Sequence, residues 1–196
     1  MRPVDEAAKD RSFVAFRTRL IAAAERRDSS YILSVVDARI KNGFGGDDGI
    51  GAFRRGWKLP GRNSRFWTEF LTVIKNGGGF DDGGKMFVAP YSFSAWPADL
   101  DGFEYYVVFG SDVNLRKRPD LGSEVISKLS YNVVTIEPET LSKSGRSEYP
   151  GWRLVRTLGG QTGYVKQEFV RSPIDHRAGF EKKRGVWKMT FFLAGD

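Results

Sequence analysis

The 196-residue sequence contains no cysteine. This excludes disulfide frameworks, thiolate nucleophiles, iron–sulfur clusters and cysteine-ligated zinc. Histidine occurs once, as His176. A metal site built from several histidines is therefore excluded, and a serine triad would have to use this single imidazole. We expect neither a metal nor a cofactor.

Long apolar runs are also lacking. No stretch approaches the roughly 18 apolar residues of a membrane-spanning helix, so no transmembrane segment is predicted. The first ten residues lack the apolar segment of a secretory signal. Two locations stay open on this basis: the cytoplasm for the sequence as it stands, or the periplasm or cell envelope if a signal peptide has been removed.

Basic residues exceed acidic ones, with 31 Lys and Arg against 24 Asp and Glu. Residues 105–196 carry 15 basic and 10 acidic side chains, whereas residues 1–104 carry 16 and 14. The excess favours an anionic partner. Because the two signs are interspersed, however, nucleic acid is an unlikely partner by this measure.

Helical periodicity dominates the first 75 residues. Apolar residues at spacings of three and four predict a helix over 11–27, and Asp28 supplies the N-cap of a second, shorter helix. Alternation predicts a strand over 38–44. Asp47 or Asp48 is expected to cap a short helix through Trp57, and Ser64 a further helix that runs to the glycines at 77–79.

Strand-like patterns dominate the rest of the chain. Short alternating segments predict strands over 86–89, 105–109, 113–117, 125–129, 133–136, 152–157 and 162–165. Residues 177–182 and 186–193 form a predicted β-hairpin, whose apolar face needs a covering layer that the N-terminal helices can provide. The sequence therefore predicts an α+β fold.

Two possible motifs are better explained as turns. Residues 79–85 have the Gly-x4-Gly-Lys spacing of a phosphate loop, but Met86 stands where a metal-binding hydroxyl is needed. The acidic pairs at 47–48 and 81–82 lack the spacing of a calcium loop.

Four segments of the C-terminal half carry a recognisable pattern. They are Val-Asn-Leu-Arg-Lys-Arg-Pro at 113–119, Ser-Glu-Val-Ile-Ser-Lys-Leu at 123–129, Gly-Trp-Arg-Leu-Val at 151–155 and Gly-Tyr-Val at 163–165. In order and spacing they resemble a bacterial SH3-like domain over 105–171. The resemblance implies a small β-barrel, filled by Leu115, Val125, Leu129, Val133, Trp152 and Val165.

The flanking segments, 1–104 plus 172–196, resemble the cystatin-like cone of nuclear-transport-factor-like proteins, in which helices cover a curved sheet. This resemblance implies that the SH3-like barrel is inserted between the helices and the terminal hairpin. The competing arrangement is a helical N-terminal domain followed by a barrel.

The SH3-like resemblance implies a non-catalytic recognition protein of the bacterial cell envelope, which binds a cell-wall peptide or a partner protein through a groove with aromatic walls. By their positions in the pattern, the expected ligand-binding residues are Asn114, Arg116, Tyr131, Trp152 and Tyr164. The basic charge is compatible with approach to an anionic envelope.

The alternative is a small-ligand-binding or enzymatic protein with a pocket inside the helix-covered sheet. Its candidate residues are Tyr31, Asp37, Trp57 and His176, since a pocket needs converging polar groups beside aromatic walls. The two hypotheses differ in what they require of His176, which matters only in the second.

Overall fold

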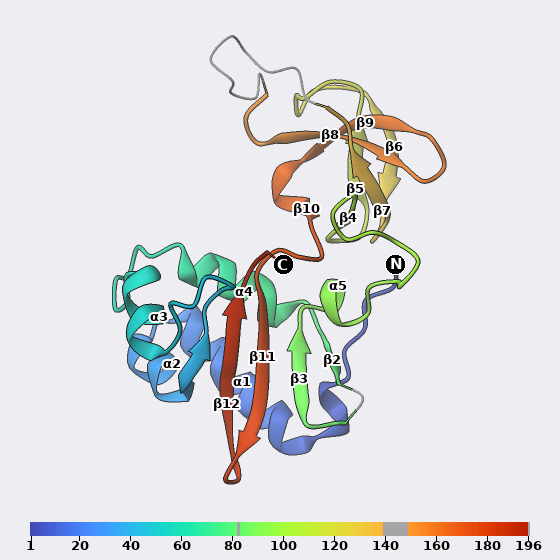
Figure 1. Ribbon diagram of the computed structural model, residues 1–196. Coiled ribbons are helices and arrows are strands. Elements are labelled where there is room, and N and C mark those ends of the chain that lie inside the picture. The colour runs from blue at the N-terminus through green and yellow to red at the C-terminus, as the bar shows by residue number, and fades with distance from the viewer. Residues whose placement is uncertain (82, 139–148, 196) are drawn as a thin grey trace. The chain divides into compact units, whose positions relative to one another are not determined.

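The computed structural model describes residues 1–81, 83–138 and 149–195 and has an α+β fold (Figure 1). The chain forms two compact units. The all-β unit comprises Met1–Arg2 and Pro97–Pro173, and the helix-covered unit comprises Pro3–Trp96 and Ile174–Asp196. The second unit is therefore built from both ends of the chain.

The helices of the helix-covered unit begin at side-chain caps where the sequence provides them. Asp10 accepts hydrogen bonds from the backbone N–H groups of Ser12 and Phe13, and Asp28 accepts one from Tyr31. Such caps satisfy amides that have no partner within the helix. The helices are α1 (Arg11–Glu25), α2 (Ser29–Val35), α3 (Ile50–Gly56), α4 (Phe66–Lys75) and α5 (Tyr91–Ser94), with the 3₁₀ turn η1 (Ala7–Lys9).

Two expected caps differ from the structure. Gly49, rather than Asp47 or Asp48, is the N-cap of α3, because the Asp48 carboxylate instead accepts hydrogen bonds from the Lys41 side chain and the Asn42 amide. Arg65 is the N-cap of α4, although the Ser64 hydroxyl still accepts a hydrogen bond from the first helical amide. The short helix α5 falls in a connection for which no helix was predicted.

These helices pack on a five-stranded sheet. Its order is β1-β12-β11-β3-β2, with β1 parallel to β12 and the other pairs antiparallel. The strands are β1 (Val36–Lys41), β2 (Gly79–Phe80), β3 (Met86–Ala89), β11 (Arg177–Lys183) and β12 (Val186–Leu193). The predicted terminal hairpin is confirmed, and its tip uses Arg184 and Gly185 with positive φ.

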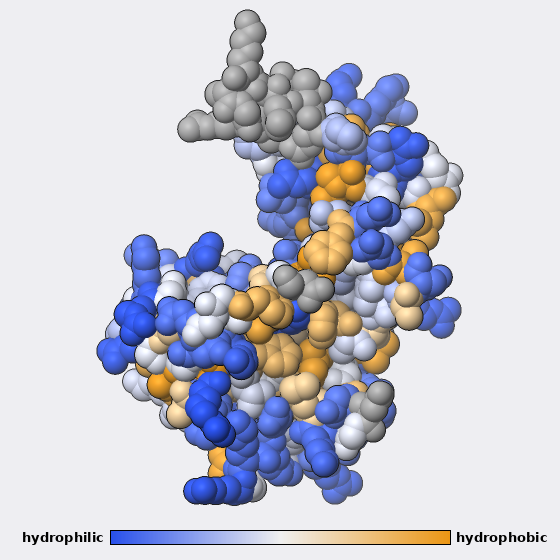
Figure 2. Space-filling view, viewed as in Figure 1, coloured by the Kyte–Doolittle hydropathy of each residue, from blue (hydrophilic) through white to orange (hydrophobic). Residues whose placement is uncertain are grey.

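Aromatic side chains fill the space between the sheet and the helices. Phe13 of α1 is fully buried and its ring centroid lies 4.2 Å from that of Phe87 and 4.9 Å from that of Trp187. Phe180 and Phe192 of the hairpin join the same core. The hairpin therefore packs on the N-terminal helices, as predicted. We call the opposite side of the sheet, which faces the viewer in Figures 1 and 2, its helix-free face.

The all-β unit contains one seven-stranded sheet with the order β10-β4-β7-β8-β9-β5-β6. Its strands, which agree closely with those predicted, are β4 (Tyr105–Val108), β5 (Val113–Arg116), β6 (Val125–Leu129), β7 (Val133–Ile136), β8 (Trp152–Thr157), β9 (Thr162–Lys166) and β10 (Val170–Arg171), with the 3₁₀ turn η2 (Gln167–Phe169). The predicted small β-barrel is wrong. Among the described strands β6 and β10 are sheet edges, so the sheet does not close into a barrel.

The core of the all-β unit is small and aliphatic, and comprises Val108, Val113, Leu115, Leu129, Val134, Val155 and Val165. The sequence-predicted core is wrong at Val125, which is 41% exposed. The bulge between β5 and β6 pairs Val125 with Arg116, whose side chain lies on the other side of the strand from buried Leu115.

Over the described ranges, none of the helices combines the length and the apolar character needed to cross a membrane.

Candidate functional site

Four of the five ligand-binding residues predicted for the all-β unit lie on one side of three neighbouring strands. Arg116 of β5 pairs with Tyr164 of β9, and Trp152 of β8 pairs with Lys166 two residues further along β9. Asn114 precedes Arg116 by two positions and so points to the same side. We call this surface, made by Asn114, Arg116, Trp152, Leu154, Tyr164 and Lys166, the outer face.

A glycine allows the strands of the outer face to come together. A Cβ on Gly163 would lie 2.8 Å from the carbonyl oxygen of Arg116 and 2.9 Å from Cγ of Leu115. These distances are shorter than van der Waals contact, so a larger residue would push β9 away from β5. Gly163 therefore sets the spacing that brings Tyr164 beside Arg116.

Arg116 is held in place by the loop that follows β5. Its guanidinium donates a hydrogen bond of 2.8 Å to the carbonyl oxygen of Ser123. The buried hydroxyl of Ser123 in turn accepts from the backbone N–H of Arg118. Lys117 and Glu124 close the base of the loop with a backbone hydrogen bond and an ion pair. The loop thus forms an ordered wall beside the outer face.

Aromatic and cationic side chains alternate at the other end of the outer face. The ammonium of Lys166 lies 4.5 Å from the centroid of the Trp152 ring, which is a cation–π contact. The rings of Tyr149 and Tyr164 meet edge to face with centroids 5.7 Å apart. The sequence interpretation missed Lys166 and Tyr149. The sequence does contain a signal for Lys166, because it follows Tyr164 by two positions on one strand and so lies on the same side.

The carboxylate beside the outer face is already paired. Glu137 accepts two hydrogen bonds from Arg156, of 2.9 and 2.7 Å. This bidentate pair lowers the pKa of Glu137 and raises that of Arg156. The ammonium of Lys166 and the guanidinium of Arg116 therefore give the outer face a positive character.

Tyr131 lies away from the outer face. It occupies the turn between β6 and β7 with a positive φ, and its backbone N–H donates to the carbonyl of Gly110. This turn adjoins the start of β5, where Val113 pairs with Leu129, whereas Arg116 is at the end of that strand. The strand between them spans roughly 10 Å.

The alternative pocket is divided by the structure. Trp57 and His176 line one hollow of about 340 Å³ in the helix-covered unit, together with Asn42 and Arg65. Asp37 instead forms an ion pair with Lys183, seven residues along from His176. Its neighbour Val36 pairs with Met189, which pairs with Phe180, four residues along the chain from His176, and Asp37 does not line the hollow that holds the imidazole. Tyr31 packs against the core beneath the helices.

His176 has the surroundings of an oriented imidazole. Its ring stacks on Phe192 with centroids 5.2 Å apart and meets the edge of Trp57 at 5.0 Å. Nδ1 lies 3.6 Å from Oε1 of Glu69, within ion-pair distance when the imidazole is protonated. The carboxylate of Glu69 was not predicted, because α4 brings it to His176 only in the folded chain.

Asn42 adds an unusual polar atom to the same hollow. Its side-chain amide donates to the carbonyl oxygens of Asp47 and Gly49. Its Oδ1 atom is buried and has no hydrogen-bond partner among the residues that the structure describes. Buried acceptors are nearly always satisfied in folded proteins, so this atom is an exception in the part of the chain that the structure describes.

In the described part of the chain no three acidic or histidine side chains gather in a way that would hold a metal ion. Comparison with known families finds no family model that matches the sequence, and no curated protein matches it.

Proposed function

We propose that this protein is a non-catalytic recognition protein of the bacterial cell envelope, and that the outer face of the all-β unit binds a cell-wall peptide or a partner protein. The observation that carries the proposal is the common side of the sheet shared by Asn114, Arg116 and Tyr164, with the largely buried Trp152 beneath Lys166. The SH3-like pattern of the sequence points to the same four residues.

The chemistry of the outer face suits an extended chain that carries carboxylates. Arg116 and Lys166 attract negative charge, whereas Tyr149 and Tyr164 offer flat apolar surfaces with a polar edge. The ordered loop after β5 limits the entropy that binding must remove. These features favour peptide recognition.

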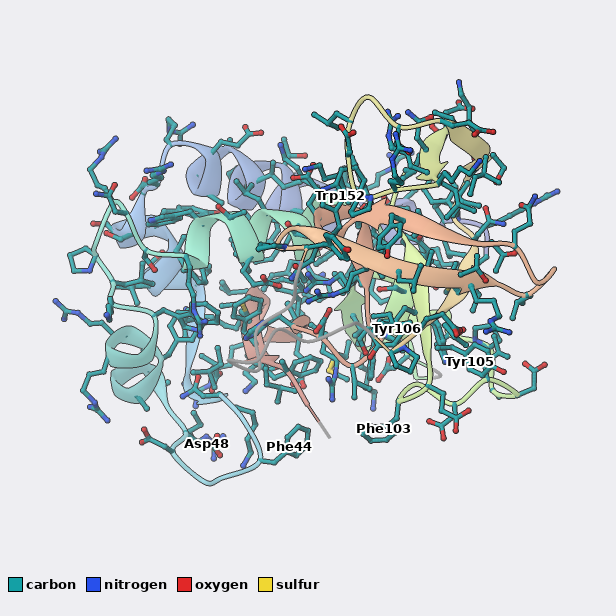
Figure 3. All side chains as sticks on the ribbon, turned by 90° about the horizontal axis from the view of Figure 1, so that it is seen from above. Phe44, Asp48, Phe103, Tyr105, Tyr106 and Trp152 are labelled. Atoms are coloured by element: carbon teal, nitrogen blue, oxygen red, sulfur yellow. The ribbon has the colours of Figure 1, made fainter. Side chains whose placement is uncertain are left out.

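The test is a pull-down of the purified protein on insoluble bacterial cell wall, with and without about 0.5 M salt, which screens surface charges. Wild-type protein is expected to stay bound in salt, because aromatic contacts are not screened. The variants Tyr164→Ala and Arg116→Ala are expected to lose binding. Phe103→Ala is the matched control, since Phe103 is 64% exposed and lies apart from Trp152 (Figure 3).

Tyr131→Ala shows whether the turn that bears it takes part in binding, since the structure places this tyrosine away from the outer face. Binding that salt alone abolishes, or that Phe103→Ala reduces as much as Tyr164→Ala, would contradict the proposal. Circular dichroism of each variant separates lost binding from lost folding.

A second candidate function rests on the His176 hollow. We propose that this hollow binds a small molecule between Trp57 and His176. The observations that favour it are the Trp57 and Phe192 rings beside the imidazole and the Glu69 contact, which orients it. An imidazole oriented by a carboxylate is also suited to general acid–base chemistry.

A small-molecule screen by ligand-observed NMR tests this second function. Hits are expected to weaken at least about tenfold with His176→Ala, because an aromatic wall and a hydrogen-bonding group are lost together. Tyr164→Ala is the control in the other unit and should leave such hits unchanged. Hits that survive His176→Ala would exclude the hollow, and the cell-wall experiment is independent of this result.

A further inference from the structure

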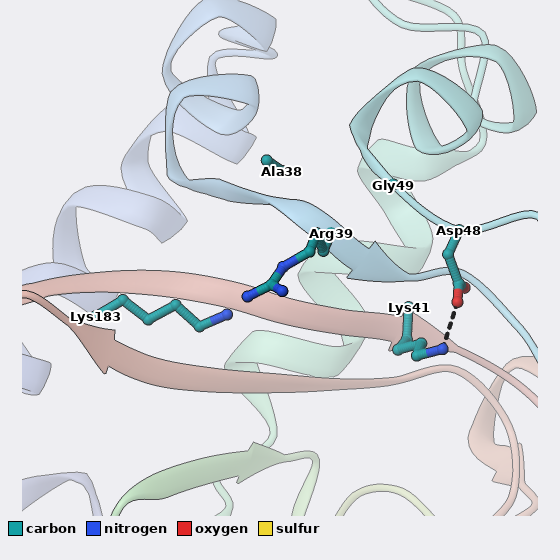
Figure 4. A pocket seen from close by; sticks show the side chains of 6 residues that line it. All are labelled: Ala38, Arg39, Lys41, Asp48, Gly49 and Lys183. Carbon is teal, nitrogen blue, oxygen red and sulfur yellow. Dashed lines mark hydrogen bonds and ion pairs between the residues drawn. The ribbon is translucent and has the colours of Figure 1, made fainter.

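Three cationic side chains line a second hollow of the helix-covered unit. Arg39, Lys41 and Lys183 line a space of about 640 Å³ together with Asp48 (Figure 4). Arg39 and Lys41 alternate along β1, so both point to the helix-free face, and Lys183 comes from the end of β11. Figure 4 shows the Arg39 guanidinium and the Lys183 ammonium directed toward one another.

Two of these three cations already have a carboxylate. Lys183 donates to Asp37 at 2.8 Å, and Lys41 donates to Asp48. Asp48 is fixed further by the backbone N–H of Asn42, and Asp37 by that of Arg39. The two lysines are therefore held at the sides of the hollow by anchored carboxylates.

Arg39 is the cation left over. Within the described part of the chain its guanidinium makes no hydrogen bond and no ion pair. Its charge contributes only slightly to the lowered pKa of Asp37, which the hydrogen bond from Lys183 mainly causes. Asp37, which binds Lys183, offsets part of the repulsion between the Lys183 ammonium and the Arg39 guanidinium. The hollow contains three cations and two carboxylates, which leaves one positive charge uncompensated.

We propose that this hollow binds a phosphate group of a small molecule, with Arg39 as the principal contact and Lys183 and Lys41 on either side. A guanidinium presents a planar pair of N–H donors that matches two oxygens of a phosphate, and each ammonium can take another oxygen. A tetrahedral phosphate offers acceptors in three directions, as these cations require, whereas a carboxylate offers them in one plane. The doubly negative phosphate also outweighs the excess charge.

The walls of the hollow suit a small molecule that enters from solvent. Its walls are the strand β1 on one side and the segment that leads to Gly49 on the other, where the backbone N–H of Gly49 is bound to the carbonyl oxygen of Ile40. This bond and the Lys41–Asp48 pair close the segment against β1 without using Arg39 or Lys183. A recess of this kind accommodates the terminal phosphate of a soluble molecule.

Isothermal titration calorimetry of the full chain with inorganic pyrophosphate at low salt tests the proposal. Arg39→Gln is expected to weaken binding at least about tenfold, the usual consequence of losing a charged hydrogen-bonding pair. Arg39→Lys, which keeps the charge but loses the planar pair of donors, should fall between Arg39→Gln and wild type. Amide chemical shifts of Lys41 and Gly49 should move on titration of the wild type.

The matched control is Arg19→Gln, an exposed arginine of α1 that makes the same change in net charge. It should bind pyrophosphate within about twofold of wild type, since it alters only long-range electrostatics. Equal weakening by Arg19→Gln and Arg39→Gln would overturn the proposal, as would the absence of binding to pyrophosphate and to vesicles alike. Vesicles of phosphatidylglycerol and phosphatidylcholine form the second arm, in which Arg39-dependent binding without pyrophosphate binding would overturn the small-molecule ligand and assign the phosphate to a lipid headgroup.

Discussion

Gly163→Ala is expected to loosen the outer face without touching a ligand-binding side chain. The added Cβ would meet the carbonyl oxygen of Arg116 at 2.8 Å, Cγ of Leu115 at 2.9 Å and Cδ1 of Ile126 at 3.0 Å. The first contact is with backbone, which cannot rotate away, so β9 must move. Overpacking of this kind destabilises a fold by about 1–3 kcal/mol.

Backbone hydrogen exchange measures this loss within the all-β unit alone. The opening equilibrium of the Leu115 and Val165 amides should rise about 5- to 150-fold, which corresponds to the same 1–3 kcal/mol. The Ile32 amide, in the other unit, should be unaffected. Binding to cell wall should weaken in parallel, because Tyr164 would separate from Arg116.

Gly159→Ala is the control for this experiment. The nearest atom to its added Cβ is Oγ1 of Thr157, at 3.9 Å, and φ at Gly159 is not in the left-handed region. Its effect should stay within about 0.5 kcal/mol. Equal protection in the Gly163→Ala and wild-type proteins would refute the spacing role of Gly163.

Three further predictions concern the helix-covered unit. Phe13→Ala should lower its free energy of unfolding by about 3–5 kcal/mol, since the ring is fully buried among other rings; a loss below about 1 kcal/mol in urea unfolding would contradict this packing. Asp10→Ala should cost about 1 kcal/mol through loss of the α1 cap, and Asp10→Ser should restore most of it. The hydrogen bond from Lys183 lowers the pKa of Asp37, so the folded state holds fewer protons there than the unfolded state. Stability should therefore fall as the pH drops below about 4, and Asp37→Asn should make the urea midpoint less sensitive to pH in that range.

The elements predicted most accurately were those with local signals. Asp28 and the apolar spacing after it fixed α2, and the turn at 183–186 fixed the terminal hairpin. The failures involved competition from distant groups. Asp48 could not cap α3 because Lys41 and Asn42 engage its carboxylate, which no local pattern reveals.

The candidate sites show the same contrast between local signals and contacts of distant groups. The common side of Asn114, Arg116, Trp152 and Tyr164 follows from strand alternation once the pairing is known, and the SH3-like pattern supplied the residues. Asp37 and His176 were grouped by residue type alone. Strand pairing separates them, since His176 precedes the first residue of β11, whereas Val36, next to Asp37, pairs with Met189 opposite Phe180.

The sequence by itself determined the α+β class, the positions of most helices and strands and the absence of any cysteine chemistry. These depend on local periodicity, caps and turns, which act over a few residues. Only the tertiary structure decided that Glu69 faces His176, that Arg39 and Lys183 point into one hollow and that Gly163 sets the spacing of β5 and β9. Each of these depends on strand pairing or helix packing between residues far apart in the chain, and such contacts leave no periodic signal in one sequence.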